Sequence, residues 1–170
     1  MTVLLVNYEY PPIGAGAATA TQQIARCLVA LGHHPIVLTS GFGTLRGPVE
    51  ESGVRVLRLN SPRRKREASS VWEMAAFGAL AAIRVRQLIR SGRVQAVIAF
   101  FSIPCGPVAW WARCGTGVPY VVSLRGGDVP GTEPGLRFVH ALLSPLRRKI
   151  LRGARAVVAN SPGLKTLSEC

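Results

Sequence analysis

The sequence VLLVNYEYPPIGAGA occupies residues 3–17 and shows how the fold begins. Residues 3–6 are an uninterrupted apolar run, which is typical of a strand that is buried on both faces of a parallel sheet. Residues 7–17 then bring two prolines and two glycines together, which indicates a loop. The opening therefore predicts a buried strand followed by a glycine-bearing loop.

A helix and a second strand follow this loop. Apolar residues recur at the spacing of one helix face, and they are Ile24, Cys27, Leu28 and Leu31. Gly32 is placed to end the helix, and His33 and His34 lie at a tight turn after it, where a structural role is expected. The apolar residues 36–38 predict the second strand. A strand, a helix and a strand in this order are the unit of a parallel sheet.

The same alternation continues along the chain. Residues 41–53 hold four glycines and a proline and are predicted to be a loop. Further strands are expected at 54–59, 94–101, 119–124 and 154–159, and further helices at 71–91, 107–113, 135–151 and from Pro162. This pattern predicts an α/β fold with one doubly wound parallel sheet, helices on both faces and strand order 3-2-1-4-5-6. A length of 170 residues suits one such domain.

Two segments indicate which faces are buried. In strand 54–59, Arg55 and Arg58 interrupt the apolar residues, which predicts a position nearer the edge of the sheet. In helix 71–91, one apolar stripe is expected to pack on the sheet. Its members are Met74, Phe77, Ala81, Val85 and Leu88.

Residues 94–112 are nineteen residues without a charge, a length that could span a bilayer. Pro104, Gly106 and Pro107 interrupt them, so a strand, a turn and a helix start fit better. The four cysteines show no CxxC spacing, which argues against a zinc site, and no metal or other cofactor is expected. The first residues lack a basic leader, so we expect a cytoplasmic protein with reduced thiols.

Positive charge is concentrated in the second half of the chain. Lys and Arg total 21 against 8 acidic residues, a net charge of +13. The excess begins with residues 63–66 (RRKR), in a segment at 60–70 that is expected to be polar and mobile, and continues at Arg84, Arg86, Arg90 and Arg93. Such a field favours anionic partners, although most charge runs are solvated surface and a general preference for Arg is the alternative. Aromatic residues make up 6% and no RNP-like motif is present, which argues against specific nucleic-acid recognition.

Two loops at strand ends carry the candidate site, because ligands of such sheets bind beyond the carboxyl ends of the strands. Gly14 and Gly16 would let the backbone of the first loop approach a phosphate at the start of the next helix. Thr19 stands where the dinucleotide fingerprint needs its third glycine, and no acidic residue follows the second strand, so NAD binding is disfavoured. The alternative is that the two glycines only shape a long loop.

The second loop reads SLRGGDVP at residues 123–130. Arg125 can pair with a phosphate or carboxylate as a fork, and Asp128 can orient sugar hydroxyls or accept a proton. The alternative is a local Arg125–Asp128 ion pair that fixes the turn.

Four stretches together carry a family resemblance: VNYEYPPIGAGA at 6–17, LVALGHHPIVLTS at 28–40, VVSLRGGDVPG at 121–131 and ARAVVANSPGLKTLSE at 154–169. In this order they resemble the amino-terminal domain of family 4 (group 1) glycosyltransferases of the GT-B fold. The resemblance implies that residues 1–170 are one Rossmann-like acceptor-side domain and that a carboxy-terminal donor domain lies outside the chain. It also implies a hexosyltransferase that moves sugar from a nucleotide-sugar to a saccharide or lipid-linked acceptor, with retention and without a metal.

The resemblance also implies roles for individual residues. Gly14 and Gly16 would lie at the donor diphosphate, Arg125 and Asp128 would act at the transferred sugar, and the cleft would be lined by Ser102 and Ser161. Arg125 stands where the family often has a histidine. The acidic donor motif is missing from this chain, so the chain alone is expected to be inactive.

Many members of this family use a basic face of this domain to hold the membrane, so a peripheral position on the inner face of the plasma membrane is a further expectation. The competing interpretation is a non-catalytic anion-binding module for membrane or nucleic acid. Steep, unselective loss of affinity with salt would mark that module.

Overall fold

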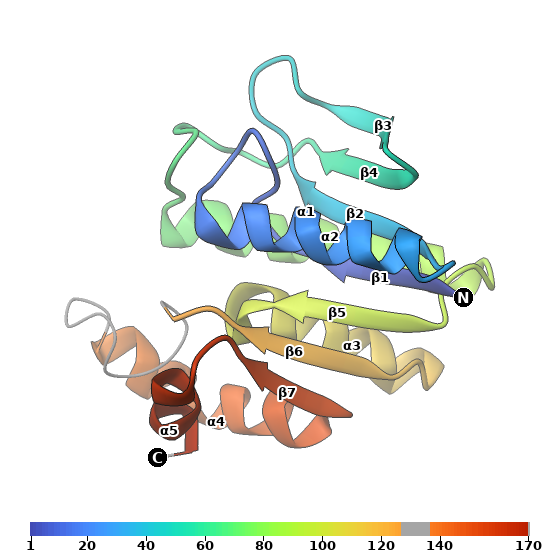
Figure 1. Ribbon diagram of the computed structural model, residues 1–170. Coiled ribbons are helices and arrows are strands. Elements are labelled where there is room, and N and C mark those ends of the chain that lie inside the picture. Colours follow the sequence, from blue (N-terminus) through green and yellow to red (C-terminus); the bar gives the residue numbers. More distant parts are fainter. Residues whose placement is uncertain (127–136, 170) are drawn as a thin grey trace.

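Seven strands form one sheet in the computed structural model, which describes residues 1–126 and 137–169 (Figure 1). The strand order is β3-β4-β2-β1-β5-β6-β7. The strands are β1 (Thr2–Val6), β2 (His34–Ser40), β3 (Gly47–Glu51), β4 (Val54–Leu59), β5 (Ala96–Phe100), β6 (Tyr120–Leu124) and β7 (Ala156–Ala159). Six of these strands run parallel in the expected order 3-2-1-4-5-6, which confirms that prediction.

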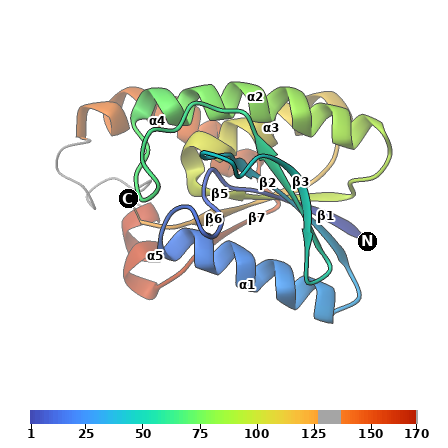
Figure 2. The same ribbon diagram turned by 90° about the horizontal axis from the view of Figure 1, so that it is seen from above.

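Helices cover both faces of the sheet, as expected (Figure 2). The helices are α1 (Gly16–Ala30), α2 (Val71–Arg90), α3 (Gly106–Thr116), α4 (Arg137–Gly153) and α5 (Pro162–Glu169), with a short π-turn, η1 (Phe101–Cys105), ahead of α3. Helices α2, α3 and α4 lie on one face, and α1 and α5 lie on the other (Figure 2). Because the parallel strands end at one edge, the loop with Gly14 and the start of the loop with Arg125 share that edge, as predicted.

The prediction of a loop over residues 41–53 is wrong, because β3 lies within it. β3 pairs antiparallel with β4, from Gly47 opposite Arg58 to Glu51 opposite Val54. The hairpin turns at Ser52 and Gly53, whose φ angles are 52° and 77°. Two successive positive φ angles match the right-handed twist of a two-residue hairpin. The frequent glycines of this segment obscured a short edge strand.

With β3 beside it, one of the two arginines of β4 is buried. Arg55 is exposed as expected, but Arg58 is only 5% exposed. The Arg58 guanidinium donates from Nη2 to the carbonyl oxygen of Pro11 at 2.7 Å and lies 4.0 Å from the Glu51 carboxylate. Arg58 is therefore an internal anchor for the first loop rather than an outward-facing charge.

The core lies on both sides of the sheet. The expected stripe of α2 is buried at Phe77, Ala81, Val85 and Leu88, while Met74 is only half-buried and Ile89 is buried in addition. Residues 94–112 form β5, η1 and the start of α3 instead of one long helix. Within the described residues, no helix combines the length and apolar character needed to cross a bilayer.

Candidate functional site

The loop between β1 and α1 lies at the carboxyl edge of the sheet and is held in place by hydrogen bonds of Asn7. Asn7 is fully buried, and its Nδ2 donates to Thr21 Oγ1 at 2.7 Å and to the carbonyl oxygen of Ala17 at 3.3 Å. The Asn7 Oδ1 accepts the backbone N–H of Glu9 at 3.1 Å. The Asn7 side chain thus ties the loop to the first turns of α1 and fixes the backbone at Glu9.

Gly14 and Glu9 pack against each other in this loop. Gly14 has φ +88°, and a Cβ at this position would lie 2.6 Å from the Glu9 Cβ. The backbone N–H of Ala15, directly before α1, acts on the Glu9 carboxylate in the direction that lowers its pKa. Both the backbone angle and the close approach therefore require glycine at position 14.

Gly16 is the first residue of α1 and has open space around it, since no described atom lies within 4 Å of a Cβ built there. Ala15 stands at the N-cap and supplies no side-chain hydrogen bond to the helix. The first N–H groups of a helix lack intrahelical acceptors and attract anions. Gly14 and Gly16 thus stand at a helix start suited to phosphate, and their binding role stays a prediction.

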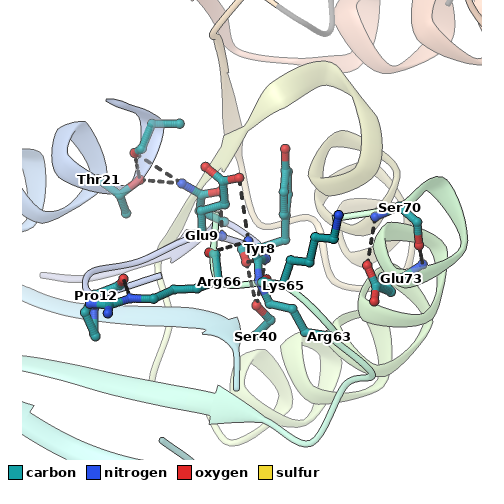
Figure 3. Close-up of polar contacts among 12 residues, drawn as sticks. Tyr8, Glu9, Pro12, Thr21, Ser40, Arg63, Lys65, Arg66, Ser70 and Glu73 are labelled. Atoms are coloured by element: carbon teal, nitrogen blue, oxygen red, sulfur yellow. Dashed lines mark hydrogen bonds and ion pairs between the residues drawn. The ribbon is translucent and has the colours of Figure 1, made fainter. Parts of the chain in front are cut away.

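Residues 61–67, which we call the arginine strap, cross over the first loop. The Arg63 side chain is only 1% exposed. Its guanidinium donates four hydrogen bonds, to Lys65 O at 3.0 Å, Tyr8 O at 3.1 Å, Arg66 O at 3.2 Å and Ser40 Oγ at 3.3 Å (Figure 3). The first cation of the basic cluster is therefore a buried crosslink between β2, the strap and the first loop.

The strap is bonded to the first loop at two further points and to α2 at its other end. The Arg66 Nε donates to Pro12 O at 2.7 Å, and the Gly14 N–H donates to Arg66 O at 2.9 Å. The Glu73 carboxylate accepts the backbone N–H groups of Arg64 and Ser70, each at 2.8 Å, and the Ser70 bond completes a capping box at the start of α2. These backbone N–H groups, that of Ser70 first, lower the pKa of Glu73.

The interpretation of residues 63–66 as a solvated charge run is therefore wrong for Arg63, whose side chain is buried, whereas Arg66 is exposed and bonded to Pro12. Sequence reasoning read the RRKR run as a surface patch because a charge run on its own carries no information about long-range partners. In the fold, the backbone carbonyl oxygens of the first loop, which has no regular structure, need donors, and arginine side chains supply them.

Glu9 and Arg63 form the buried charge pair of this edge. Glu9 is 8% exposed, and its Oε1 lies 3.9 Å from Arg63 Nη2. Burial raises the pKa of Glu9, and the Arg63 charge and the Ala15 N–H oppose that rise. Burial likewise lowers the pKa of Arg63, with Glu9 opposing. Sequence reasoning missed Glu9, although its position after a buried strand was the available signal.

The remaining predicted site residues fall into different surroundings. Arg125 follows β6 directly, and its guanidinium lies 5.1 Å from the centre of the Phe100 ring. Ser102 is fully buried within η1, so it does not line an open cleft as expected. Asp128 lies outside the described residues.

Ser161 follows β7 and lines a hollow of about 760 Å³ together with Asn160. Its Oγ accepts the N–H of Leu164 at 3.2 Å and so caps α5. Strands are spaced about 4.8 Å apart, and β5 and β6 lie between β1 and β7. Ser161 therefore shares an edge with Gly14 but belongs to a separate part of it.

A larger groove opens beside the first loop, and we call it the α2–α4 groove. It has a volume of about 1090 Å³ and lies between the first part of α2 and the middle of α4, beside η1 and the start of α3. Its lining is mostly apolar, and Tyr8 and Glu9 belong to it. The groove thus reaches the same edge as Gly14. Among the described residues, no three His, Cys, Asp or Glu side chains are grouped as metal ligands.

Comparison with known proteins shows to which family the chain belongs. The family described as Glycosyl transferase 4-like domain matches residues 15–168. The chain belongs to this glycosyltransferase family. It is thus a glycosyltransferase domain, and the family suggested by the four sequence stretches is confirmed. A search of curated proteins gives no match.

Solved structures share the fold of this domain at low identity. Sucrose-phosphate synthase from Thermosynechococcus elongatus superposes with a TM-score of 0.77 and 16% identity, over 100% of this chain and 46% of that one. A glycosyltransferase from Rickettsia africae ESF-5 gives 0.59 and 22%, over 97% and 38%. MurG from Acinetobacter baumannii gives 0.54 and 16%, over 96% and 42%. The chain thus spans less than half the length of each of these three proteins.

Proposed function

We propose that this glycosyltransferase domain is the acceptor-side half of a retaining hexosyltransferase that uses a nucleotide-sugar donor. The observation that carries the proposal is the glycine loop, which is tied down at the start of α1 on the carboxyl edge of the sheet. A fixed loop holds the start of α1 and its first N–H groups in place without reorganisation, which is what stabilisation of a developing charge requires. The acceptor is a saccharide or a lipid-linked molecule.

The chemistry assigns each part of the edge a task. When the bond between the anomeric carbon and the donor diphosphate breaks, negative charge grows on the leaving diphosphate. The N–H groups at the start of α1 would stabilise that charge, with Gly14 and Gly16 allowing close approach. Arg125, and Asp128 as predicted from the sequence, would act at the transferred sugar. A second domain would supply the nucleotide pocket and the opposite wall of the cleft.

We expect residues 1–170 alone to show no transfer above background, because the proposal puts half of the donor site elsewhere. The measurement is release of nucleoside diphosphate from a panel of labelled nucleotide-sugars, with saccharides and lipid extracts as acceptors. A polypeptide extended through the coding sequence that follows residue 170 should transfer sugar with retained anomeric configuration, read by NMR. Turnover by the short chain, or an inverted product, would contradict the proposal.

We also propose a cytoplasmic protein that adsorbs to the inner face of the plasma membrane through exposed cations. The structure reduces the number of cations that could contact the membrane. The Arg63 side chain is buried, and the Arg86 guanidinium lies 4.1 Å from the centre of the Trp111 ring. Arg64 and Lys65 are exposed on the strap. Each cation near an anionic surface contributes about 1 kcal/mol, and the effect is screened beyond about 8 Å at physiological salt.

The double variant Arg64→Ser/Lys65→Ser should lose most adsorption to anionic vesicles at low salt, measured by co-sedimentation. The control Arg26→Ser/Arg55→Ser removes the same amount of charge from exposed positions elsewhere and should retain adsorption to anionic vesicles. Equal loss of adsorption in both variants would mean that net charge, and not the position of Arg64 and Lys65, causes the adsorption. Equal binding of the wild type to neutral vesicles would remove the electrostatic explanation.

A further inference from the structure

Glu9 is a buried carboxylate in the loop where the proposed function puts the donor diphosphate. It is 8% exposed and borders the α2–α4 groove. Its side chain lies against Gly14, since a Cβ built there would be 2.7 Å from both Cδ and Oε2 of Glu9. Gly14 lies just before the first residue pair that opens α1, Ala15 at the N-cap and Gly16. The carboxyl group itself, and not only the stem of the side chain, therefore lies beside the start of this helix.

The surroundings of this carboxylate are those of a bound anion. The backbone N–H of Ala15 acts on it in the direction that lowers the pKa of Glu9. The Arg63 guanidinium supplies positive charge, with its Nη2 3.9 Å from Glu9 Oε1 (Figure 3). The N–H groups of a helix start and a nearby cation both attract negative charge. Glu9 is therefore an internal anion next to the N–H groups that are proposed to hold the diphosphate.

The contact between Glu9 and Arg63 is an attraction of charges and not a hydrogen bond. A separation of 3.9 Å is longer than a hydrogen bond between nitrogen and oxygen. The four hydrogen bonds of the guanidinium go to oxygen atoms of other residues. These four bonds do not depend on the charge of Glu9. Glu9 can therefore gain or lose a proton without breaking the crosslink that holds the first loop.

A phosphate at the start of α1 would bring a second negative charge close to this carboxylate. Burial already raises the pKa of Glu9, which means that the charged form is disfavoured before any ligand arrives. Two like charges in a site sheltered from water are costly, and the cost is removed when one of them is protonated. Both phosphates of a nucleotide-sugar are esterified and stay ionised at neutral pH. Glu9 is therefore the group that would take the proton.

The other charged and titratable groups around Glu9 and Arg63 are less suited to this role. Among the described residues they are Tyr8 of the first loop, Arg64, Lys65, Arg66 and Glu67 of the strap, Glu73 of α2 and Arg147 of α4. Glu67 is exposed, and backbone N–H groups lower the pKa of Glu73. Of the three carboxylates, Glu9 is thus the one that is buried with its pKa raised.

We propose that Glu9 is an internal anion at the start of α1, and that a donor phosphate binds there together with one proton, which Glu9 takes from the solvent. The proton converts the carboxylate into a carboxylic acid, whose O–H can donate a hydrogen bond. It returns to the solvent when the phosphate leaves. The position of the phosphate rests on the proposed function, and Glu9 makes phosphate binding at this edge dependent on pH.

Sulfate tests this coupling with the 170-residue chain. It resembles phosphate and keeps its charge from about pH 5 to about pH 8, whereas a phosphate monoester titrates at about pH 6. Ionic strength is held constant with NaCl, and binding is followed by NMR at the backbone amides of residues 16–18. We expect the affinity at these amides to fall by up to about tenfold per pH unit as the pH rises above the pKa of Glu9 in the free chain.

The reverse effect is measured on the same chain without any substitution. Because linkage is reciprocal, sulfate must raise the pKa of Glu9 by the factor by which protonation of Glu9 strengthens sulfate binding. The carbon-13 shift of the Glu9 carboxyl carbon, followed against pH with and without sulfate, reports this pKa. We expect an increase of about one pH unit or more at saturating sulfate.

Glu9→Gln keeps the size of the side chain and removes its charge. At about pH 7.5 it should bind sulfate at residues 16–18 about tenfold or more tightly than the wild type, and its affinity should vary with pH by less than about twofold. Glu67→Gln is the matched control, since it removes the same charge from an exposed residue of the strap. It should keep the pH dependence of the wild type. Circular dichroism and thermal unfolding establish that both variants fold.

The possible outcomes separate this proposal from the proposed function. Sulfate binding at residues 16–18 with the same pH dependence in the wild type and in Glu9→Gln would overturn the role of Glu9 and leave the proposed function standing. An unchanged pKa of Glu9 at saturating sulfate would do the same. No sulfate binding at these amides in either chain would overturn the role of Glu9 and count against the proposed phosphate position. Coupling without sugar transfer by the extended protein would count against the proposed function alone.

Discussion

Arg63→Ala is expected to lower the free energy of unfolding by about 3–5 kcal/mol, the range for removing one partner of a buried charged pair. The guanidinium is almost fully covered and donates to four oxygens, two of which belong to the strap itself. Without it, the Glu9 carboxylate keeps its burial and loses its nearest positive charge. Equilibrium urea unfolding, followed by circular dichroism, measures the change.

Two variants separate this effect from a loss of net charge. Arg64→Ala removes the same charge from the neighbouring exposed residue and should change stability by less than about 0.5 kcal/mol. Arg63→Lys keeps the charge but loses the fork that reaches several carbonyl oxygens at once, so only part of the stability should return. Equal losses in Arg63→Ala and Arg64→Ala would mean that the strap is held by other contacts.

The order of the parallel strands could be predicted because it depends on local pattern and on general connection rules. Buried strands and amphipathic helices alternate visibly along the chain, and right-handed crossovers leave few topologies. β3 was not predicted because an exposed edge strand has no apolar alternation to detect. Most residues of β3 are exposed. The Ser52-Gly53 turn was the available sign.

The sequence could indicate the first loop of the candidate site because its glycines follow a buried strand and precede a helix. The structure adds that Gly14 has φ +88°, an angle that requires glycine. The partner of that loop is a strap distant in sequence, and no spacing rule connects Arg63 to Tyr8 or Glu9. Ser102, which was expected to line the cleft, is buried within the η1 turn two residues after β5 ends, and the sequence pattern did not indicate that turn.

Gly14→Ala is expected to be the second large effect, at about 2–5 kcal/mol of lost stability. A positive φ costs an alanine about 1–2 kcal/mol, and forced overlap in a packed region adds about 1–3 kcal/mol. The overlap is with the Glu9 Cβ at 2.6 Å. Gly16→Ala, two residues away, meets no described atom and begins a helix, so it should stabilise by about 0.4–1 kcal/mol.

A double-mutant cycle assigns the cost of Gly14→Ala to its two causes. Glu9→Gly removes the Cβ that an alanine at position 14 would strike, and it leaves the positive φ unchanged. In that background Gly14→Ala should cost about 1–2 kcal/mol, the backbone part alone, so the two positions should couple by the overlap part, about 1–3 kcal/mol. Coupling near zero, measured by urea unfolding of the four chains, would mean that the backbone angle alone requires glycine. It would also mean that Glu9 moves away at little cost, which a carboxylate locked between Arg63 and the Ala15 N–H should not do.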